Sequence, residues 1–91
     1  MKKFTIAELW QDNGTPAVKV GDIVQIIDEK TYEEIEPNYL SKSEQVQKIV
    51  GKLLKVEQVV KHDSTLFSYI ANLNGEKTID FFDWEIEYVL R

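Results

Sequence analysis

The alternation of apolar and polar positions along the chain predicts a protein built mainly from β-strands. Short stretches rich in β-branched and aromatic residues recur through the second half, separated by turn residues. The alternation is most regular over residues 66–73, and the Asn74-Gly75 pair that follows is a strong hairpin signal. We therefore predict five strands, at residues 23–27, 52–61, 66–73, 77–82 and 86–90.

Two irregularities are expected within these strands and the turns between them. The alternation in the second strand changes phase near Gln58, as it would at a β-bulge. Asp83 can begin a short turn through Trp84 and Glu85 before the last strand.

The N-terminal segment carries a helical signal. Thr5 and Glu8 have the spacing of a capping box, and the apolar residues that follow share one helical face. A short helix is therefore predicted within residues 5–13. It belongs to an N-terminal arm, residues 1–16, that precedes the strands.

A polar segment separates the first two predicted strands. Residues 29–48 are largely polar, with Pro37-Asn38 in the middle, and predict a long loop with at most local structure. Ser41 and Glu44 repeat the capping spacing ahead of an apolar i, i+3, i+4 pattern, so a helix over residues 42–50 is one of two alternatives for the second half of this segment.

The order of these segments carries a resemblance to a known family. A glycine-aspartate turn precedes the strand within Lys19–Ile26, a long loop leads to Gly51–Val59, and a hairpin at Asn74-Gly75 leads to the closing segment Trp84–Val89. This resembles the small Src-homology-3-like barrels of the KOW and Tudor type. The resemblance covers residues 17–91 and implies a five-stranded barrel within one domain, residues 1–91. Stand-alone acidic barrels of this size are also similar to proteins encoded by phages and other mobile elements.

Size and composition limit the classes of protein that the chain can belong to. With 91 residues and 43% hydrophobic content, it can form one core and is too apolar for a disordered tail. The absence of cysteine excludes disulfides, thiolate zinc sites and a cysteine nucleophile, and favours a reducing compartment such as the cytoplasm. No apolar run approaches the roughly 20 residues of a membrane-spanning helix, so no membrane association is expected.

The charge of the chain argues against nucleic acid as a partner. Eleven basic and sixteen acidic residues give a formal charge of −5, whereas the KOW barrels that bind nucleic acid have basic surfaces. Two alternatives remain open. A nucleic-acid-associated barrel would use the lysine-rich segment, and an acidic mimic of nucleic acid would occupy a basic groove on another protein. The lysines of the first alternative are Lys48, Lys52, Lys55 and Lys61.

The sequence gives little support for catalysis, a cofactor or a metal. His62 is the single histidine, and its neighbours Asp63 and Ser64 on a predicted turn cannot converge with it on one point. The acids near the C-terminal end, among them Asp80 and Asp83, match no calcium loop. The four glycines are isolated and form no phosphate-binding loop. We predict a protein that is not an enzyme and carries neither cofactor nor metal.

Aromatic residues provide the most useful candidate site. In a barrel of the type described, the long loop and the closing turn face each other across a groove. Aromatic rings flanked by acids would suit a basic or proline-containing peptide. Exposure is favoured for the two tyrosines of this set, and a core position for the tryptophan taken alone. The candidate partner-binding residues are Tyr32, Tyr39, Glu33, Glu34, Glu36, Phe82 and Trp84.

We therefore predict a non-catalytic protein-binding module, acting as an accessory or inhibitory factor of a phage or mobile element, with a basic protein or peptide as its partner. Exposed strand edges in a partly open barrel would also allow two copies to pair, which leaves a homodimer as a further option.

Overall fold

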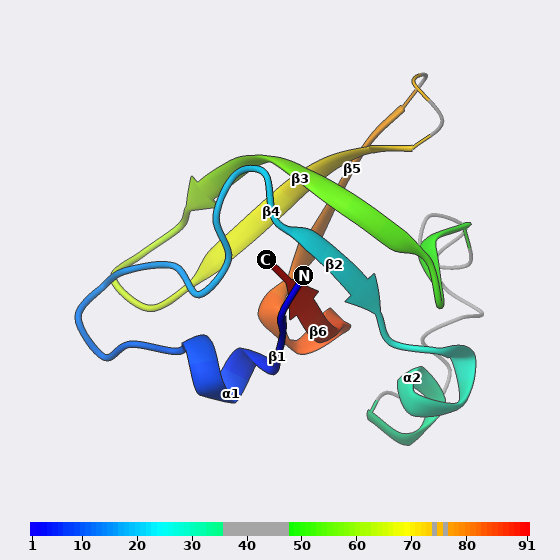
Figure 1. Ribbon diagram of the computed structural model, residues 1–91, viewed down its shortest axis with the longest axis horizontal. Coiled ribbons are helices and arrows are strands. Elements are labelled where there is room, and N and C mark those ends of the chain that lie inside the picture. Colours follow the sequence, from blue (N-terminus) through cyan, green and yellow to red (C-terminus); the bar gives the residue numbers. More distant parts are fainter. Residues whose placement is uncertain (36–47, 74, 76) are drawn as a thin grey trace.

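A curved antiparallel sheet of six strands makes up most of the computed structural model, which describes residues 1–35, 48–73, 75 and 77–91 (Figure 1). The mainly β class is confirmed, and each predicted strand is found within one residue of its expected ends. The strands are β1 (Lys3–Phe4), β2 (Ile23–Ile26), β3 (Leu53–Lys61), β4 (Phe67–Leu73), β5 (Lys77–Phe82) and β6 (Ile86–Leu90).

The strand order is β1-β6-β2-β3-β4-β5, and every pair of neighbours is antiparallel. Within the described residues, β1 and β5 lie at opposite ends of this order, so the sheet is open and not a closed barrel. The expected five strands correspond to β2–β6, and the two-residue β1 is an addition that the sequence pattern did not predict.

The core lies on one face of this curved sheet. On β4, Phe67, Tyr69 and Ala71 are buried, and on β5, Ile79 and Phe81 are buried. The alternation seen in the sequence therefore reports which face of the β4–β5 hairpin packs inward. The fully buried residues Val24, Ile26, Val56 and Val89 extend the core beneath the other strands.

A β-bulge in β3 confirms the predicted change of phase. The pairing with β4 shifts register between Val56 and Gln58. Val56 lies opposite Ala71, and Val59 lies opposite Tyr69, although the two valines are three positions apart along the chain, an odd interval that would place them on opposite faces of a regular strand. Because directly opposed residues share a face of the sheet, the bulge allows both valines to point toward the core.

The N-terminal arm is integrated into the sheet. Helix α1 (Ile6–Leu9) has the predicted capping box, in which the Thr5 N–H donates to Glu8 Oε1 (2.9 Å) and the Glu8 N–H donates to Thr5 Oγ1 (3.2 Å). It is shorter than the expected span of 5–13 because Trp10 already has extended backbone angles. Since β1 pairs with β6, the arm extends the sheet by one strand.

The prediction that residues 29–48 form a loop is wrong at its beginning, where helix α2 (Glu29–Ile35) forms. Asp28 Oδ1 accepts a hydrogen bond from the Thr31 N–H (2.8 Å), as a helix N-cap does, and the helix buries Tyr32 completely. Residues 36–47 lie outside the described residues, including most of the optional helix over 42–50. Lys48 and Ile49 are helical.

Candidate binding surface

Three rings form a continuous aromatic row on the surface where β5 meets β6. The His62 and Phe82 ring centroids are 5.8 Å apart, and the Phe82 and Trp84 rings stack with centroids 6.4 Å apart and planes inclined by 6°. Trp84 is 44% exposed, and Phe82 is half-buried. We call His62, Phe82 and Trp84 the aromatic row. Its exposed rings offer flat apolar surface to a partner.

A buried carboxyl group fixes the backbone on which the aromatic row is built. The predicted turn after β5 is a 3₁₀ helix, η1 (Asp83–Glu85). Glu85 is only 3% exposed, and its two oxygens accept hydrogen bonds from the Phe82 N–H (3.0 Å) and from the Tyr32 hydroxyl (2.5 Å). The Glu85 carboxyl group therefore links η1 to both β5 and α2. These hydrogen bonds fix the position of the turn that carries Trp84.

A second hydrogen bond ties η1 to the sheet. The Tyr69 hydroxyl on β4 donates to Asp83 Oδ1 (2.5 Å). Burial raises the pKa of Asp83 above its ordinary value, although the bond from Tyr69 acts in the opposite direction. The pKa of the Tyr69 hydroxyl is also raised, first by burial and then by the neighbouring Asp83. The two residues on either side of Trp84, Asp83 and Glu85, are therefore both anchored to the body of the protein.

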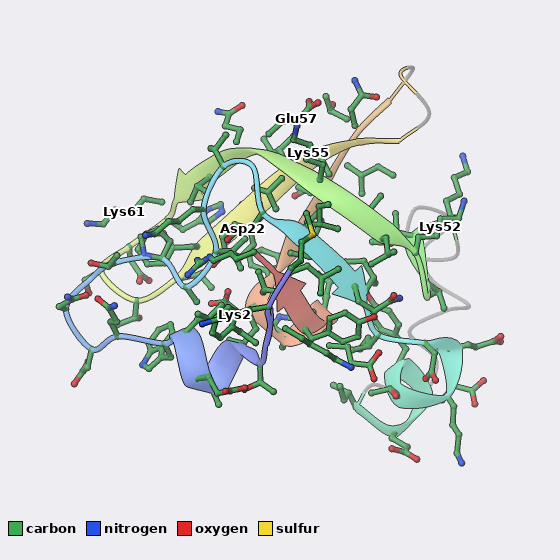
Figure 2. The ribbon with its side chains drawn as sticks, viewed as in Figure 1. Lys2, Asp22, Lys52, Lys55, Glu57 and Lys61 are labelled. Atoms are coloured by element: carbon green, nitrogen blue, oxygen red, sulfur yellow. The ribbon has the colours of Figure 1, made fainter. Side chains whose placement is uncertain are left out.

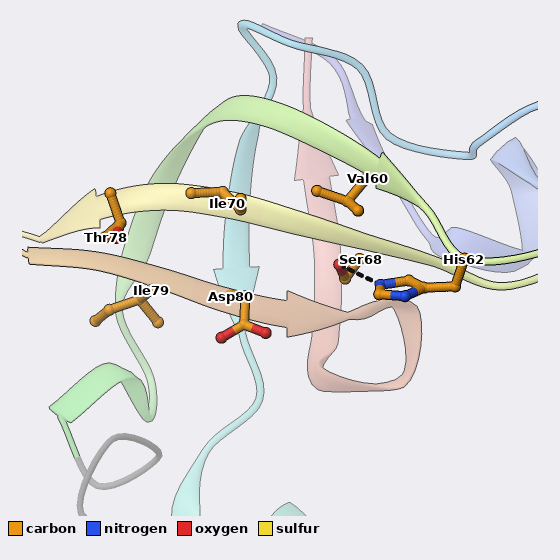
Figure 3. Close-up of a pocket in the computed structure, with 7 residues that line it drawn as sticks. All are labelled: Val60, His62, Ser68, Ile70, Thr78, Ile79 and Asp80. Carbon is orange, nitrogen blue, oxygen red and sulfur yellow. Dashed lines mark hydrogen bonds between the residues drawn. The ribbon is translucent and has the colours of Figure 1, made fainter.

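A small pocket lies at the His62 end of the aromatic row, on the outward face of β3, β4 and β5 (Figure 3). Ser68 lies opposite Val60 on β3 and opposite Phe82 on β5, which places the pocket beside the row. His62 Nε2 and Ser68 Oγ are 2.8 Å apart and hydrogen-bonded. The pocket has a volume of about 270 Å³ and is lined by Val60, His62, Ser68, Ile70, Thr78, Ile79 and Asp80.

The structure reverses the expected roles of Tyr32 and Trp84. The prediction that Tyr32 is an exposed anchor is wrong, because its side chain is fully buried and its hydroxyl donates to Glu85. The expectation that Trp84 taken alone belongs to the core is also wrong, because nearly half of its surface is exposed. The two rings meet edge to face, with centroids 6.3 Å apart, so Tyr32 supports Trp84 from α2.

The acidic candidates lie partly beside this surface. Glu33 and Glu34 follow Tyr32 on α2, and both are exposed. They bring negative charge to the helix that contacts Trp84. Tyr39 and Glu36, the remaining candidates, lie outside the described residues.

The structure gives His62 a partner that the sequence analysis missed. Asp63 is engaged within the turn, where its Oδ1 accepts hydrogen bonds from the Thr65 and Leu66 N–H groups, and the first of these is the main cause of its lowered pKa. The partner of His62 is Ser68, across the hairpin. Because Lys61 pairs with Phe67, the register of the β3–β4 hairpin brings His62 close to Ser68. Knowledge of this register would have been enough to predict the contact from the sequence.

The lysines of the nucleic-acid alternative are exposed but do not form one cluster. Lys55 and Lys61 lie on β3, and Lys52 immediately precedes this strand, so the three are spread along its length (Figure 2). Lys61 lies opposite the buried Phe67, on the core-facing side of the sheet, whereas Lys55 lies between the buried Leu54 and Val56 and points to the other face. The bulge between these two lysines separates them.

The described residues carry neither a metal-binding cluster nor a membrane-spanning helix. No group of three or more histidine or acidic side chains in that part of the chain is placed to hold a metal ion. No helix within the same residues has the length and apolar character needed to cross a membrane.

Comparison of the chain with models of known protein families, with curated proteins and with solved structures finds no match. The aromatic row, its supporting hydrogen bonds and the adjoining pocket are therefore the features that point to a function.

Proposed function

We propose that the protein is a non-catalytic binding module of the Src-homology-3-like type, acting from the cytoplasm, and that it binds an extended protein segment on the aromatic row. One observation supports this most strongly. Trp84 is 44% exposed and stacks on Phe82, yet the residues on both sides of it are anchored by hydrogen bonds to Tyr69 and Tyr32. An exposed ring held in one position loses little conformational entropy when a partner packs against it.

The charge around the row supports a basic partner. Glu33 and Glu34 are exposed on the helix that contacts Trp84, Asp80 is exposed beside the pocket, and the chain as a whole carries a formal charge of −5. Acids near aromatic faces attract cationic side chains through charge and cation–π contact. We expect the partner segment to combine basic residues with apolar or proline residues.

The experiment that tests this function is selection from a phage-displayed library of random linear peptides. The wild-type domain is compared with Trp84→Ala and with Trp10→Ala. Trp10 is 40% exposed and belongs to the N-terminal arm, so the second variant is a matched control for loss of an exposed indole. We expect wild type and Trp10→Ala to enrich the same peptides, and Trp84→Ala to lose them.

Enrichment of the same peptides by Trp84→Ala would show that the aromatic row is not the binding surface. The absence of any peptide enriched by wild type over Trp84→Ala would also contradict the proposal. Circular dichroism of the three proteins checks that each remains folded.

A further inference from the structure

We propose that the pocket beside the aromatic row accepts a lysine or arginine side chain from a partner segment that lies extended along β5. This inference rests on the proposed function and names the residue type that the site selects. It is carried by the chemistry of the pocket, by the place of β5 at the end of the sheet, and by the spacing between Asp80 and Phe82.

The pocket combines apolar walls with a carboxylate. Val60 and Ile70 line it with aliphatic surface, and the exposed Asp80 brings negative charge to it (Figure 3). Lysine and arginine have the matching form, an apolar stem with a cationic end. The volume of about 270 Å³ lies just below the roughly 300–1,000 Å³ typical of small-molecule sites, which fits one inserted side chain better than a cofactor.

The position of β5 provides a path for the backbone of the partner. β5 is the last strand in the sheet order, and β4 is its one strand neighbour within the described residues. An extended segment that adds to such an edge gains main-chain hydrogen bonds, while its alternate side chains contact one face of the sheet. That face of β5 carries Thr78, Asp80 and Phe82, which are the residues next to the pocket and the row.

The spacing along β5 predicts a pattern in the partner. Asp80 and Phe82 are two residues apart on the same face, so a strand running beside them presents side chains at the same interval of roughly 7 Å. A basic residue near Asp80 therefore places its neighbour two positions away against Phe82 and Trp84. We expect a basic residue, any residue, and then an apolar or proline residue, in either direction along the partner.

Charge complementarity distinguishes this occupant from a second copy of the chain. Each copy carries a formal charge of −5, and exposed carboxylates lie at both ends of the site, on Asp80 and on α2. A basic segment gains attraction at both ends, whereas an acidic copy meets like charges.

The test repeats the peptide selection with Asp80→Asn and Asp80→Glu. Both substitutions are at an exposed position, and the second retains the charge as a matched control. We expect wild type and Asp80→Glu to enrich a basic residue two positions from an apolar one, and Asp80→Asn to retain the apolar preference but lose the basic one. In an enriched peptide, norleucine in place of the basic residue should weaken binding to wild type about fivefold.

A second measurement follows the pocket directly. N-acetyl-lysine N-methylamide and its norleucine analogue are titrated separately into ¹⁵N-labelled protein, and the amide signals of Ser68 and Ile70 are followed. The lysine compound should shift these signals more than the norleucine compound does, and the difference should disappear in Asp80→Asn.

The outcomes separate this inference from the function on which it rests. Peptides that require Trp84 but show no basic preference, or retain it in Asp80→Asn, would overturn the pocket assignment and leave the binding function intact. Equal shifts from the lysine and norleucine compounds would also overturn it. A dimer that excludes the peptides would assign the β5 edge to a second copy and overturn the pocket assignment. If wild type and Trp84→Ala enriched the same peptides, both the binding function and the pocket assignment would be wrong.

Discussion

At the scale of single residues, the hydrogen bond between Tyr32 and Glu85 determines how the candidate site is built. These residues are 53 positions apart, and both are buried. The residues around Tyr32 are polar, so the local sequence predicts that this tyrosine is exposed. The local sequence cannot show that the distant Glu85 carboxyl group accepts a hydrogen bond from the Tyr32 hydroxyl. Buried polar groups are paired, and in this protein the pairing brings Tyr32 inward while Trp84, between two anchored acids, stays at the surface.

Tyr32→Phe is expected to destabilise the protein by about 1.5–3 kcal/mol, because it removes a hydrogen bond to a buried carboxyl group. Tyr88→Phe is the matched control, since the Tyr88 hydroxyl donates to Gln25 Oε1 in a half-buried position and over a longer distance of 3.4 Å. Urea unfolding of both variants measures the difference. A cost for Tyr32→Phe no larger than that for Tyr88→Phe would contradict the role given to Glu85.

Asp83→Asn is expected to change how stability depends on pH. Burial raises the pKa of Asp83, so the folded protein holds the carboxyl proton more tightly than the unfolded chain, in which an aspartate has a pKa of about 3.9. The stability that protonated Asp83 contributes to the folded state is fully present below the pKa of Asp83 in the unfolded chain. It is lost as the pH rises through the pKa of Asp83 in the folded protein. The stability of wild type relative to Asp83→Asn should therefore fall as pH rises from about 3 through this window.

The asparagine variant keeps an oxygen that can accept the Tyr69 hydroxyl, so the comparison isolates the charge. Denaturant unfolding at a series of pH values gives the result, with Asp80→Asn as the control for loss of one negative charge. A relative stability of wild type that increased with pH would contradict the direction of the Asp83 shift.

At the scale of elements, the sequence predicts the strands well and the helices less well. Alternation reports burial on one face of each strand, and the phase change near Gln58 locates the bulge. Helix α2 was missed because a single fully buried residue, Tyr32, holds it to the core, so no apolar stripe repeats along it. Asp28 is a residue type that favours the N-cap of a helix and could have indicated where α2 begins. Aspartate is equally common in polar turns and loops, so it did not distinguish the two.

Asp28→Ala is expected to loosen α2, because the Asp28 carboxylate accepts a hydrogen bond from the Thr31 N–H, which is also the main cause of its lowered pKa. Hydrogen exchange should become several-fold faster at the amides of residues 31–35. Asp12→Ala removes the same charge at an exposed position outside the helices and serves as the control. Exchange in α2 that responds equally to both variants would contradict an N-cap at Asp28.

At the scale of the whole molecule, the open sheet places the candidate site where β5, η1 and α2 meet. The sequence identified Phe82 and Trp84 as site residues, and the structure brings them together with His62, which the sequence pattern placed on a turn without a role in the site. The sequence could not show that the lysines of β3 are spread over two faces, because their separation depends on the bulge. Whether the fold belongs with the Src-homology-3-like barrels stays a proposal.

The net charge leads to a prediction for the rate of binding. A basic peptide approaching a chain with a formal charge of −5 should associate more slowly as salt rises, while its dissociation rate changes less. Stopped-flow fluorescence at about 50 and about 500 mM sodium chloride measures both rates. An association rate that did not respond to salt would show that charge does not guide the encounter.

The central claim, that Trp84 forms the binding surface, is tested most directly by following the two indole N–H signals of the protein by NMR. The peptide most enriched by the wild-type domain is titrated into ¹⁵N-labelled protein, and the Trp84 and Trp10 signals are assigned with the two alanine variants. We predict a large, saturable shift of the Trp84 signal and little change at Trp10. A saturating peptide that moved the Trp10 signal, or neither signal, would contradict the claim.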